Sequence, residues 1–196
     1  MEKLIEYTSS DEVKGYLEIV KVFEDGREEI HFSDKNVITS GMGVTLLEAF
    51  NTTSSKSVSL FQIVNFQVGT GGSSGLQVSG TGALAAPLSA TSQYGTNASF
   101  ETEVASLQAS GSVTTGHIFP IIPWSYIKKL TPSRVLYTIY LDENTANGIT
   151  LNEVGLFSNN IYGASPAKKF LCAYRYFTAL AKEDSFSVIF RWVIEF

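Results

Sequence analysis

Two histidines and a single cysteine are the first residues of this 196-residue chain to test for chemistry. His31 and His117 stand alone, because neither has a carboxylate or cysteine nearby at the spacing of a metal-ligand set. Cys172 lies in the run FLCAYRYF, which is typical of a buried small hydrophobe. A single cysteine also excludes an intrachain disulfide. We therefore predict no metal site.

Three other patterns could carry chemistry, and each lacks a necessary part. The carboxylate pairs Glu28–Glu29 and Asp142–Glu143 lie at predicted turns, where solvated charge explains them. The run VGTGGSSG, residues 68–75, lacks the Lys-Ser/Thr ending of a phosphate-binding loop, and no helix pattern follows it. No serine lies in a Gly-x-Ser-x-Gly elbow. We predict a non-enzymatic protein with no catalytic, cofactor-binding or metal-binding residues and no cofactor.

One carboxylate stands inside a predicted strand, in the run ITLNEVGLFS at residues 149–158. A buried, unpaired carboxylate is costly, so we expect Glu153 to contact backbone amides or a cation such as Arg175 or Arg134. Gly155 lacks a Cβ, so it can form a bulge or let a neighbouring group approach closely. We interpret this motif as architectural.

The elements that hold these residues are mostly predicted strands. Asp25-Gly26 predicts a type I′ hairpin turn between two β-rich runs. The run 134–141 alternates, and residues 185–196 place their large apolar side chains on one face. Thr39 or Ser40 is suited to cap a short helix, on which three apolar residues share a face: Val44, Leu47 and Phe50.

These elements predict a mainly β fold, an antiparallel β-sandwich or jelly-roll-like barrel with one short helix. We expect a single β-sandwich domain over residues 1–196, with a long Gly/Ser/Ala-rich loop at about 69–98. Long loops of this kind are usually functional or bound by a partner. A mobile surface loop is the other interpretation.

Composition limits the partners of the chain. A net charge of −5 argues against nucleic acid, and we interpret Lys128–Lys129 and Lys168–Lys169 as solvated strand ends or loops. No run is long and apolar enough for a membrane span, and the polar N-terminus does not resemble a signal peptide. We therefore expect a protein made in the cytoplasm that binds neither nucleic acid nor membrane.

Three short landmarks occur in a fixed order: Ile38–Gly41 at the predicted helix start, Val68–Gly71 at a strand end, and Glu153–Phe157 within a strand. This order resembles structural proteins of tailed bacteriophages, in particular the N-terminal module of tail-collar fibre proteins. That family continues into a long shaft, whereas this sequence ends at Phe196. The resemblance therefore favours an assembly component of the virion over a receptor-binding fibre.

The resemblance implies a non-enzymatic virion structural protein: a capsid decoration (cement) protein or a small tail, collar or baseplate component. It would be made in the host cytoplasm, act as a homo-oligomer and contact major capsid or tail/collar proteins. Low charge and many aromatic residues suit large protein interfaces. The alternative is a receptor- or carbohydrate-binding module of a phage tail, using exposed aromatic residues among Trp124, Tyr137, Tyr140, Tyr162, Tyr174 and Tyr176.

Overall fold

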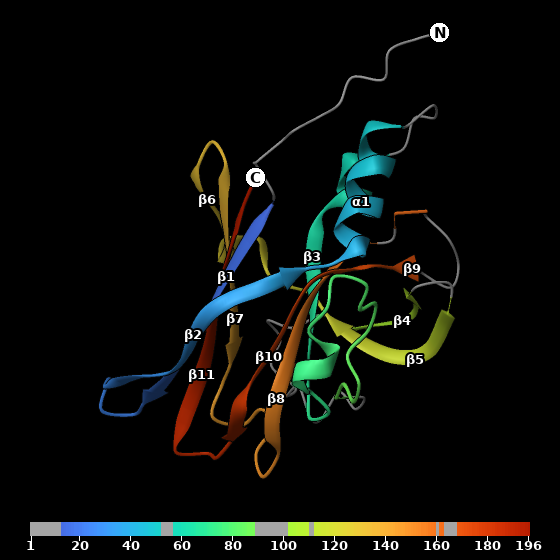
Figure 1. Ribbon diagram of the computed structural model, residues 1–196. Helices are drawn as coiled ribbons and strands as arrows, with labels where there is room; N and C mark the ends of the chain where they lie inside the picture. Colours follow the sequence, from blue (N-terminus) through green and yellow to red (C-terminus); the bar gives the residue numbers. More distant parts are fainter. Residues whose placement is uncertain (1–12, 52–56, 89–101, 110–111, 160, 163–167) are drawn as a thin grey trace, which may run out of the picture.

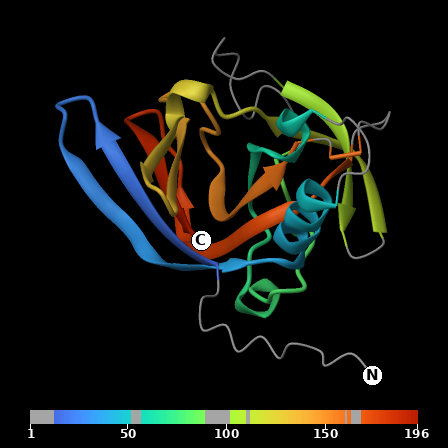
Figure 2. The same cartoon turned by 90° about the horizontal axis from the view of Figure 1, so that it is seen from above.

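The computed structural model describes residues 13–51, 57–88, 102–109, 112–159, 161–162 and 168–196; for 102–109, 112–117 and 168 it describes the backbone alone. The fold is mainly β. An eight-stranded antiparallel sheet curls into a half-barrel, with one α-helix at its upper end in the view of Figure 1. Figure 2, seen from above, shows the curl of the sheet. The predicted mainly β, antiparallel class with one short helix is confirmed.

The large sheet has the strand order β3-β8-β10-β2-β1-β11-β7-β6. Its strands are β1 Lys14–Phe23, β2 Glu28–Ile38, β3 Ile63–Gly69, β6 Ile127–Thr131, β7 Arg134–Leu141, β8 Thr150–Ser158, β10 Leu171–Ala181 and β11 Phe186–Glu195. Strand β1 pairs with both β2 and β11, so the beginning and the end of the described chain lie side by side at the centre of the sheet. No helix in the described residues is long and apolar enough to cross a membrane.

The first hairpin is present, but its turn differs from the prediction. Strands β1 and β2 are joined by a loop in which the Gly26 amide donates to the Phe23 carbonyl at 2.9 Å. Gly26 has φ +81°, whereas Asp25 does not have a positive φ. A type I′ turn needs positive φ at both central residues, so that prediction is wrong. The Asp25 carboxylate instead accepts a hydrogen bond from the Arg27 amide at 2.9 Å.

The core lies on the concave face of the half-barrel. Strand β7 buries alternate residues as predicted, and β11 does the same with larger side chains. Each large apolar side chain that is fully buried contributes about 1.5–3 kcal/mol to stability. The buried row of β11 is Phe186, Val188, Phe190, Trp192 and Ile194, and it continues across β1 through Leu17 and Ile19.

Helix α1, Ser40–Phe50, begins where the sequence predicts. Thr39 is its N-cap residue, but the Thr39 side chain makes no capping hydrogen bond. Its hydroxyl donates instead to the Leu171 carbonyl on β10. A Cβ on Gly41 would lie 2.0 Å from that same carbonyl oxygen, so the helix start packs directly on the backbone of β10. Only glycine permits this approach.

The face of α1 that packs on the sheet is not its most apolar face. The buried residues of the helix are Gly41, Met42 and Thr45. The predicted apolar row of Val44, Leu47 and Phe50 lies outside this packing surface, and both Leu47 and Phe50 are exposed. The small residues allow close contact with β10, and this contact decides the orientation of the helix.

One edge of the large sheet, strand β3, is covered by other parts of the chain. The Ile122 amide donates to the Val64 carbonyl at 2.7 Å, and the Leu88 amide donates to the Val68 carbonyl at 2.9 Å. Beside this edge lies a small sheet of order β5-β4-β9, formed by β4 Thr102–Ala109, β5 Ser112–Pro120 and β9 Lys168–Lys169. In the described part of the chain, the opposite edge, β6, has no such cover.

Candidate protein-protein interface

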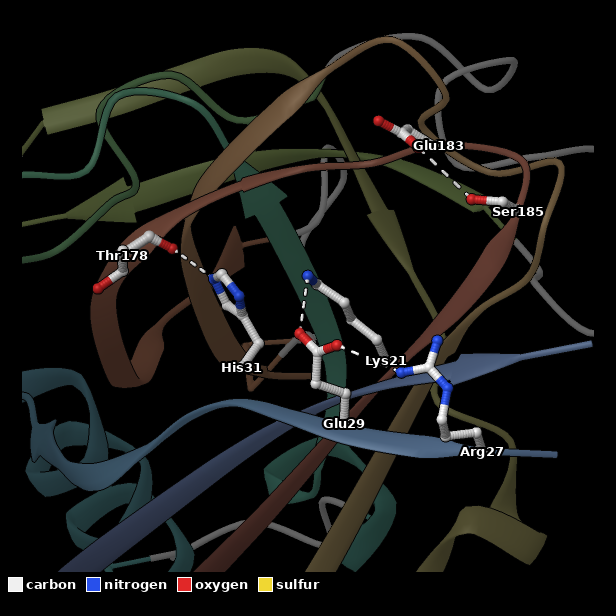
Figure 3. Close-up of polar contacts among 7 residues, drawn as sticks. All are labelled: Lys21, Arg27, Glu29, His31, Thr178, Glu183 and Ser185. Atoms are coloured by element: carbon white, nitrogen blue, oxygen red, sulfur yellow. Dashed lines mark hydrogen bonds and ion pairs between the residues drawn. The ribbon is translucent and has the colours of Figure 1, made fainter. Parts of the chain in front are cut away.

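The two histidines do not form a site. His31 lies on β2, and its Nε2–H donates to the Thr178 carbonyl on β10 at 2.8 Å, as Figure 3 shows. This bond links two neighbouring strands. His117 belongs to β5, and its side chain is outside the described residues. Within the described ranges, no three His, Cys, Asp or Glu side chains gather as they would around a metal ion.

The carboxylates of Glu28 and Glu29 take part in ion pairs near the start of β2. Glu29 lies 3.2 Å from the Nζ of Lys21 and 3.6 Å from Arg27, and Figure 3 shows all three side chains together. Glu28 lies 3.3 Å from the guanidinium of Arg191 on β11. Glu28 and Glu29 thus form surface ion pairs with these cations, and they do not form an acid-base pair with each other.

The second carboxylate pair closes the turn after β7. Asp142 accepts a hydrogen bond from the Thr145 hydroxyl at 2.6 Å. Glu143 accepts one from the buried Ser187 hydroxyl, also at 2.6 Å, and this bond lowers the pKa of Glu143. The two carboxylates therefore have separate structural partners.

Cys172 is fully buried on β10, as predicted. Burial raises the pKa of its thiol to about 12. Its sulfur lies 3.5 Å from the hydroxyl of Thr45 on α1. A thiol with this pKa carries almost no thiolate at neutral pH, so the residue acts as a packing group.

Glu153 is fully buried in β8, where it binds two segments of chain, at Gly71 and at residues 85–86. Its Oε1 accepts hydrogen bonds from the amides of Ala86 at 2.8 Å and Gly71 at 3.2 Å. Its Oε2 accepts them from the Ala85 amide at 3.0 Å and the Tyr174 hydroxyl at 3.1 Å. Burial, together with the Glu153 charge, raises the pKa of Tyr174, so the hydroxyl remains a donor. We call this set of four contacts the Glu153 clamp.

Of the partners predicted for Glu153, the backbone amides are confirmed and the cations are wrong. Arg175 pairs with Asp34 at 2.7 Å, and Arg134 pairs with Glu195 at 3.0 Å. Both arginines therefore form ion pairs with residues on strands other than β8. The amides satisfy the carboxylate without a second buried charge, so the cost of desolvating a cation is avoided and only that of the carboxylate remains.

The clamp fixes the first part of the predicted long loop. Next to it, Asn152 accepts from the Gly72 amide at 2.8 Å and donates to the Gly72 carbonyl at 3.1 Å. Residues 69–88, including the 3₁₀ helix η2 Ser74–Leu76, thus lie against the sheet edge through contacts within the chain. The remainder of the predicted loop, 89–98, lies outside the described residues.

Gly155 allows a close approach, one of its two predicted roles. A Cβ at this position would lie 2.6 Å from the Cδ1 of Leu171 and 2.7 Å from that of Leu84. The pairing of β8 with β10 and with β3 runs without a shift at Gly155. The bulge interpretation is therefore wrong at this position.

Lys169 and the pair Lys128–Lys129 have opposite environments. Lys169 is fully buried, and its Nζ lies 2.8 Å from the Oδ1 of Asn65. The prediction of a solvated lysine is wrong here, because a buried amide oxygen replaces water. The side chain of Lys168 is outside the described residues. Lys128 and Lys129 are exposed on β6, as predicted.

The five tyrosines proposed as a sugar-binding platform differ in exposure, and Tyr140 and Tyr176 are half-buried. Tyr137 and Tyr174 are buried in the core. Tyr162 is partly exposed, and its ring packs edge-on against Phe170 with centroids 5.8 Å apart. Trp124, by contrast, is exposed. An aromatic surface exists, but it lies around Trp124 and not on the predicted strands.

An apolar groove of about 290 Å³ opens at the α1 end of the half-barrel. It lies between α1, the 3₁₀ helices η1 (Val58–Phe61) and η4 (Trp124–Tyr126), and strands β6 and β7. The elements around it carry large apolar side chains with high exposed fractions: Phe50 87%, Val58 77%, Trp124 64%, Leu47 63% and Phe196 50%. We call these five residues the α1 patch. The sequence signal for it is the apolar face of α1 that Val44, Leu47 and Phe50 share.

The three sequence landmarks come together in the fold. Ile38 pairs with Ala173 on β10, which in turn pairs with β8. The landmark Val68–Gly71 lies beside Glu153–Phe157, because β3 pairs with β8 and the Gly71 amide binds Glu153. The landmark residues therefore build one junction between the helix, the sheet and the clamped loop.

Comparisons of the chain with protein-family models, with curated proteins and with solved structures gave no match.

Proposed function

We propose that this chain is a non-enzymatic structural component of a tailed-bacteriophage virion that acts through protein-protein interfaces, as a homo-oligomer and with other virion proteins. The observation that carries the proposal is the α1 patch. Monomeric proteins rarely expose large contiguous apolar surface, and such surface marks interaction sites. Here Trp124 and Phe196 line an apolar groove at one end of the fold, and Leu47, Phe50 and Val58 are exposed on α1 and η1, two of the elements that border it.

The phage assignment follows from the order of the three landmarks, and their structural roles are consistent with it. Gly41 lets α1 pack on the backbone of β10, and the Gly71 amide donates to Glu153. Gly155 leaves room for the side chains of Leu84 and Leu171. All are architectural contacts. An assembly role at the capsid, tail, collar or baseplate needs such a rigid frame behind its contact surface.

The assignment to the virion is tested by locating the chain in phage particles. Particles from an infected culture that produces the chain are purified on a density gradient and probed with an antibody to it. We expect the chain in the particle fractions, at a constant ratio to the major capsid protein. A chain found only in the soluble lysate contradicts the proposal. Glycan binding that disappears in a Trp124→Ala variant would favour the alternative, a receptor- or carbohydrate-binding module of a phage tail.

The interface itself is tested by the oligomeric state. The double variant Phe50→Ser/Val58→Ser should weaken self-association at least about tenfold, because each buried apolar anchor at an interface typically contributes more than 1 kcal/mol. Sedimentation velocity over a range of concentrations measures this effect. Both side chains are exposed in the single chain, so its unfolding free energy should change by less than about 0.5 kcal/mol.

The matched control is Ile30→Ser. Ile30 is 63% exposed on β2 and pairs with Val20 near the β1–β2 turn. The end of β2 at this turn lies away from α1 (Figure 1). This variant should associate like the unaltered chain. Equal weakening by both variants, or an unaltered chain that stays monomeric at every concentration, would show that the α1 patch is not a self-association surface.

A further inference from the structure

We propose that the free edge of β6 binds an acidic, extended segment of a partner protein, which joins the large sheet as an added strand. The inference deepens the proposed function by naming the chemistry of one partner. It rests on that function, because the partner is taken to be another protein of the virion. The backbone edge of β6 is separate from the five residues of the α1 patch, although Ile127 of β6 borders the same groove as Trp124 and Phe196.

The argument begins with the contrast between the two sheet edges. The edge at β3 is sealed by backbone bonds from Leu88 and Ile122 and by the side chains of Asn65 and Gln67, which donate to carbonyls of residues 118–120. At the other edge, β6 pairs only with β7. The Ile127 amide at the start of β6 donates to the Trp124 carbonyl in η4, and no other backbone hydrogen bond reaches the strand within the described residues. An uncovered edge is a row of backbone donors and acceptors that can pair with another strand.

The positive charge of the β6 edge indicates the chemistry of its partner. Lys128 and Lys129 lie in the middle of β6 and are exposed, and neither side chain has an ion-pair or hydrogen-bond partner within the described residues. Two copies of β6 paired edge to edge would bring lysines close to lysines, which is destabilising. The lysines therefore disfavour a second copy at this edge and favour a strand that carries carboxylates.

Apolar grooves on both faces of β6 could receive the other side chains of the added strand. Leu130, Leu136 and Val193 form the apolar part of a groove of about 510 Å³ on the outer face of the sheet. The charged part of this groove includes Glu18 and Asp34, and each of these carboxylates is paired with an arginine. Ile127 borders the groove beside α1 on the inner face. Because successive side chains of a strand point to opposite faces, an added strand would reach both grooves. The fitting segment combines apolar residues with glutamate or aspartate.

The test uses the full chain and two octapeptide probes, one alternating glutamate with valine and the other alternating lysine with valine. We expect the glutamate peptide to shift the backbone NMR signals of β6 and slow the hydrogen exchange of its outward amides. Its affinity should exceed that of the lysine peptide at least tenfold. In the variant Lys128→Glu/Lys129→Glu the preference should reverse, because the edge then carries the opposite charge.

Several results would overturn the inference. The inference is overturned if the glutamate peptide at millimolar concentration causes no NMR shifts. It is also overturned if both peptides cause equal shifts, or if the shifted signals belong to residues away from β6. Self-association that is abolished by Leu130→Pro would make a second copy the occupant. The failure of this inference is separable from that of the proposed function, because the particle and α1-patch experiments do not involve the β6 edge.

Discussion

Replacing Glu153 by alanine should lower the free energy of unfolding by about 3–5 kcal/mol. The carboxylate accepts four hydrogen bonds in a site without solvent exposure. Its removal leaves three backbone amides and one hydroxyl without their acceptor, together with a cavity. Glu153→Gln keeps the shape but brings an NH₂ group against amide donors, so it should also destabilise the fold. Urea denaturation monitored by tryptophan fluorescence measures both effects.

The control for this prediction is Glu29→Ala, which removes an exposed carboxylate paired with Lys21 and should cost less than about 1 kcal/mol. Hydrogen exchange provides the local measurement. The amides of Gly71, Ala85 and Ala86 should lose protection in the Glu153 variants before the central strands do. An unfolding free energy unchanged by Glu153→Ala would show that the clamp does not hold residues 69–88.

Two glycines on the same helix should respond to alanine with opposite signs. At Gly41 a Cβ would lie 2.0 Å from the Leu171 carbonyl oxygen, which is fixed backbone, so Gly41→Ala should cost about 3 kcal/mol. At Gly43 a Cβ meets nothing within 4 Å. Gly43→Ala should therefore stabilise the protein by about 0.5–1 kcal/mol through helix propensity alone.

Comparing Gly41→Ala with Gly43→Ala separates the effect of packing against β10 from the effect of helix propensity, because the substitution is identical and the two positions are two residues apart. Thermal and urea denaturation of both variants give the comparison. Similar changes for the two would mean that α1 does not sit against β10 at Gly41. The loss at Gly41 should also expose Cys172, whose sulfur packs under Thr45, and thiol-reagent labelling would detect it.

The strands of this protein could be predicted from sequence because their side chains alternate. The β11 row from Phe186 to Ile194 and the β7 row from Tyr137 to Leu141 are buried as the period of two indicates. The mainly β class follows from these local patterns. Gly26 also marked the correct place for the first turn, although the type of turn was wrong.

The candidate interface could not be predicted, because apolar residues on a short helix look the same whether they face the core or a partner. Leu47 and Phe50 fit a helix-packing row by spacing alone. The orientation of α1 is decided by Gly41, which has no side chain, and by Thr45, whose side chain is small. Both allow close contact with β10. That contact joins residues more than a hundred positions apart in the sequence.

Sequence alone thus determined what depends on neighbours along the chain: strand positions, the helix start, and the need of Glu153 for polar partners. Only the tertiary structure decided which partners those are, since the choice between amides and arginines depends on how β3 and β8 lie together. It also decided that Lys169 is buried while Lys128 and Lys129 stand on an uncovered edge. The physical reason is that burial and strand order arise from contacts between distant segments, which no local pattern encodes.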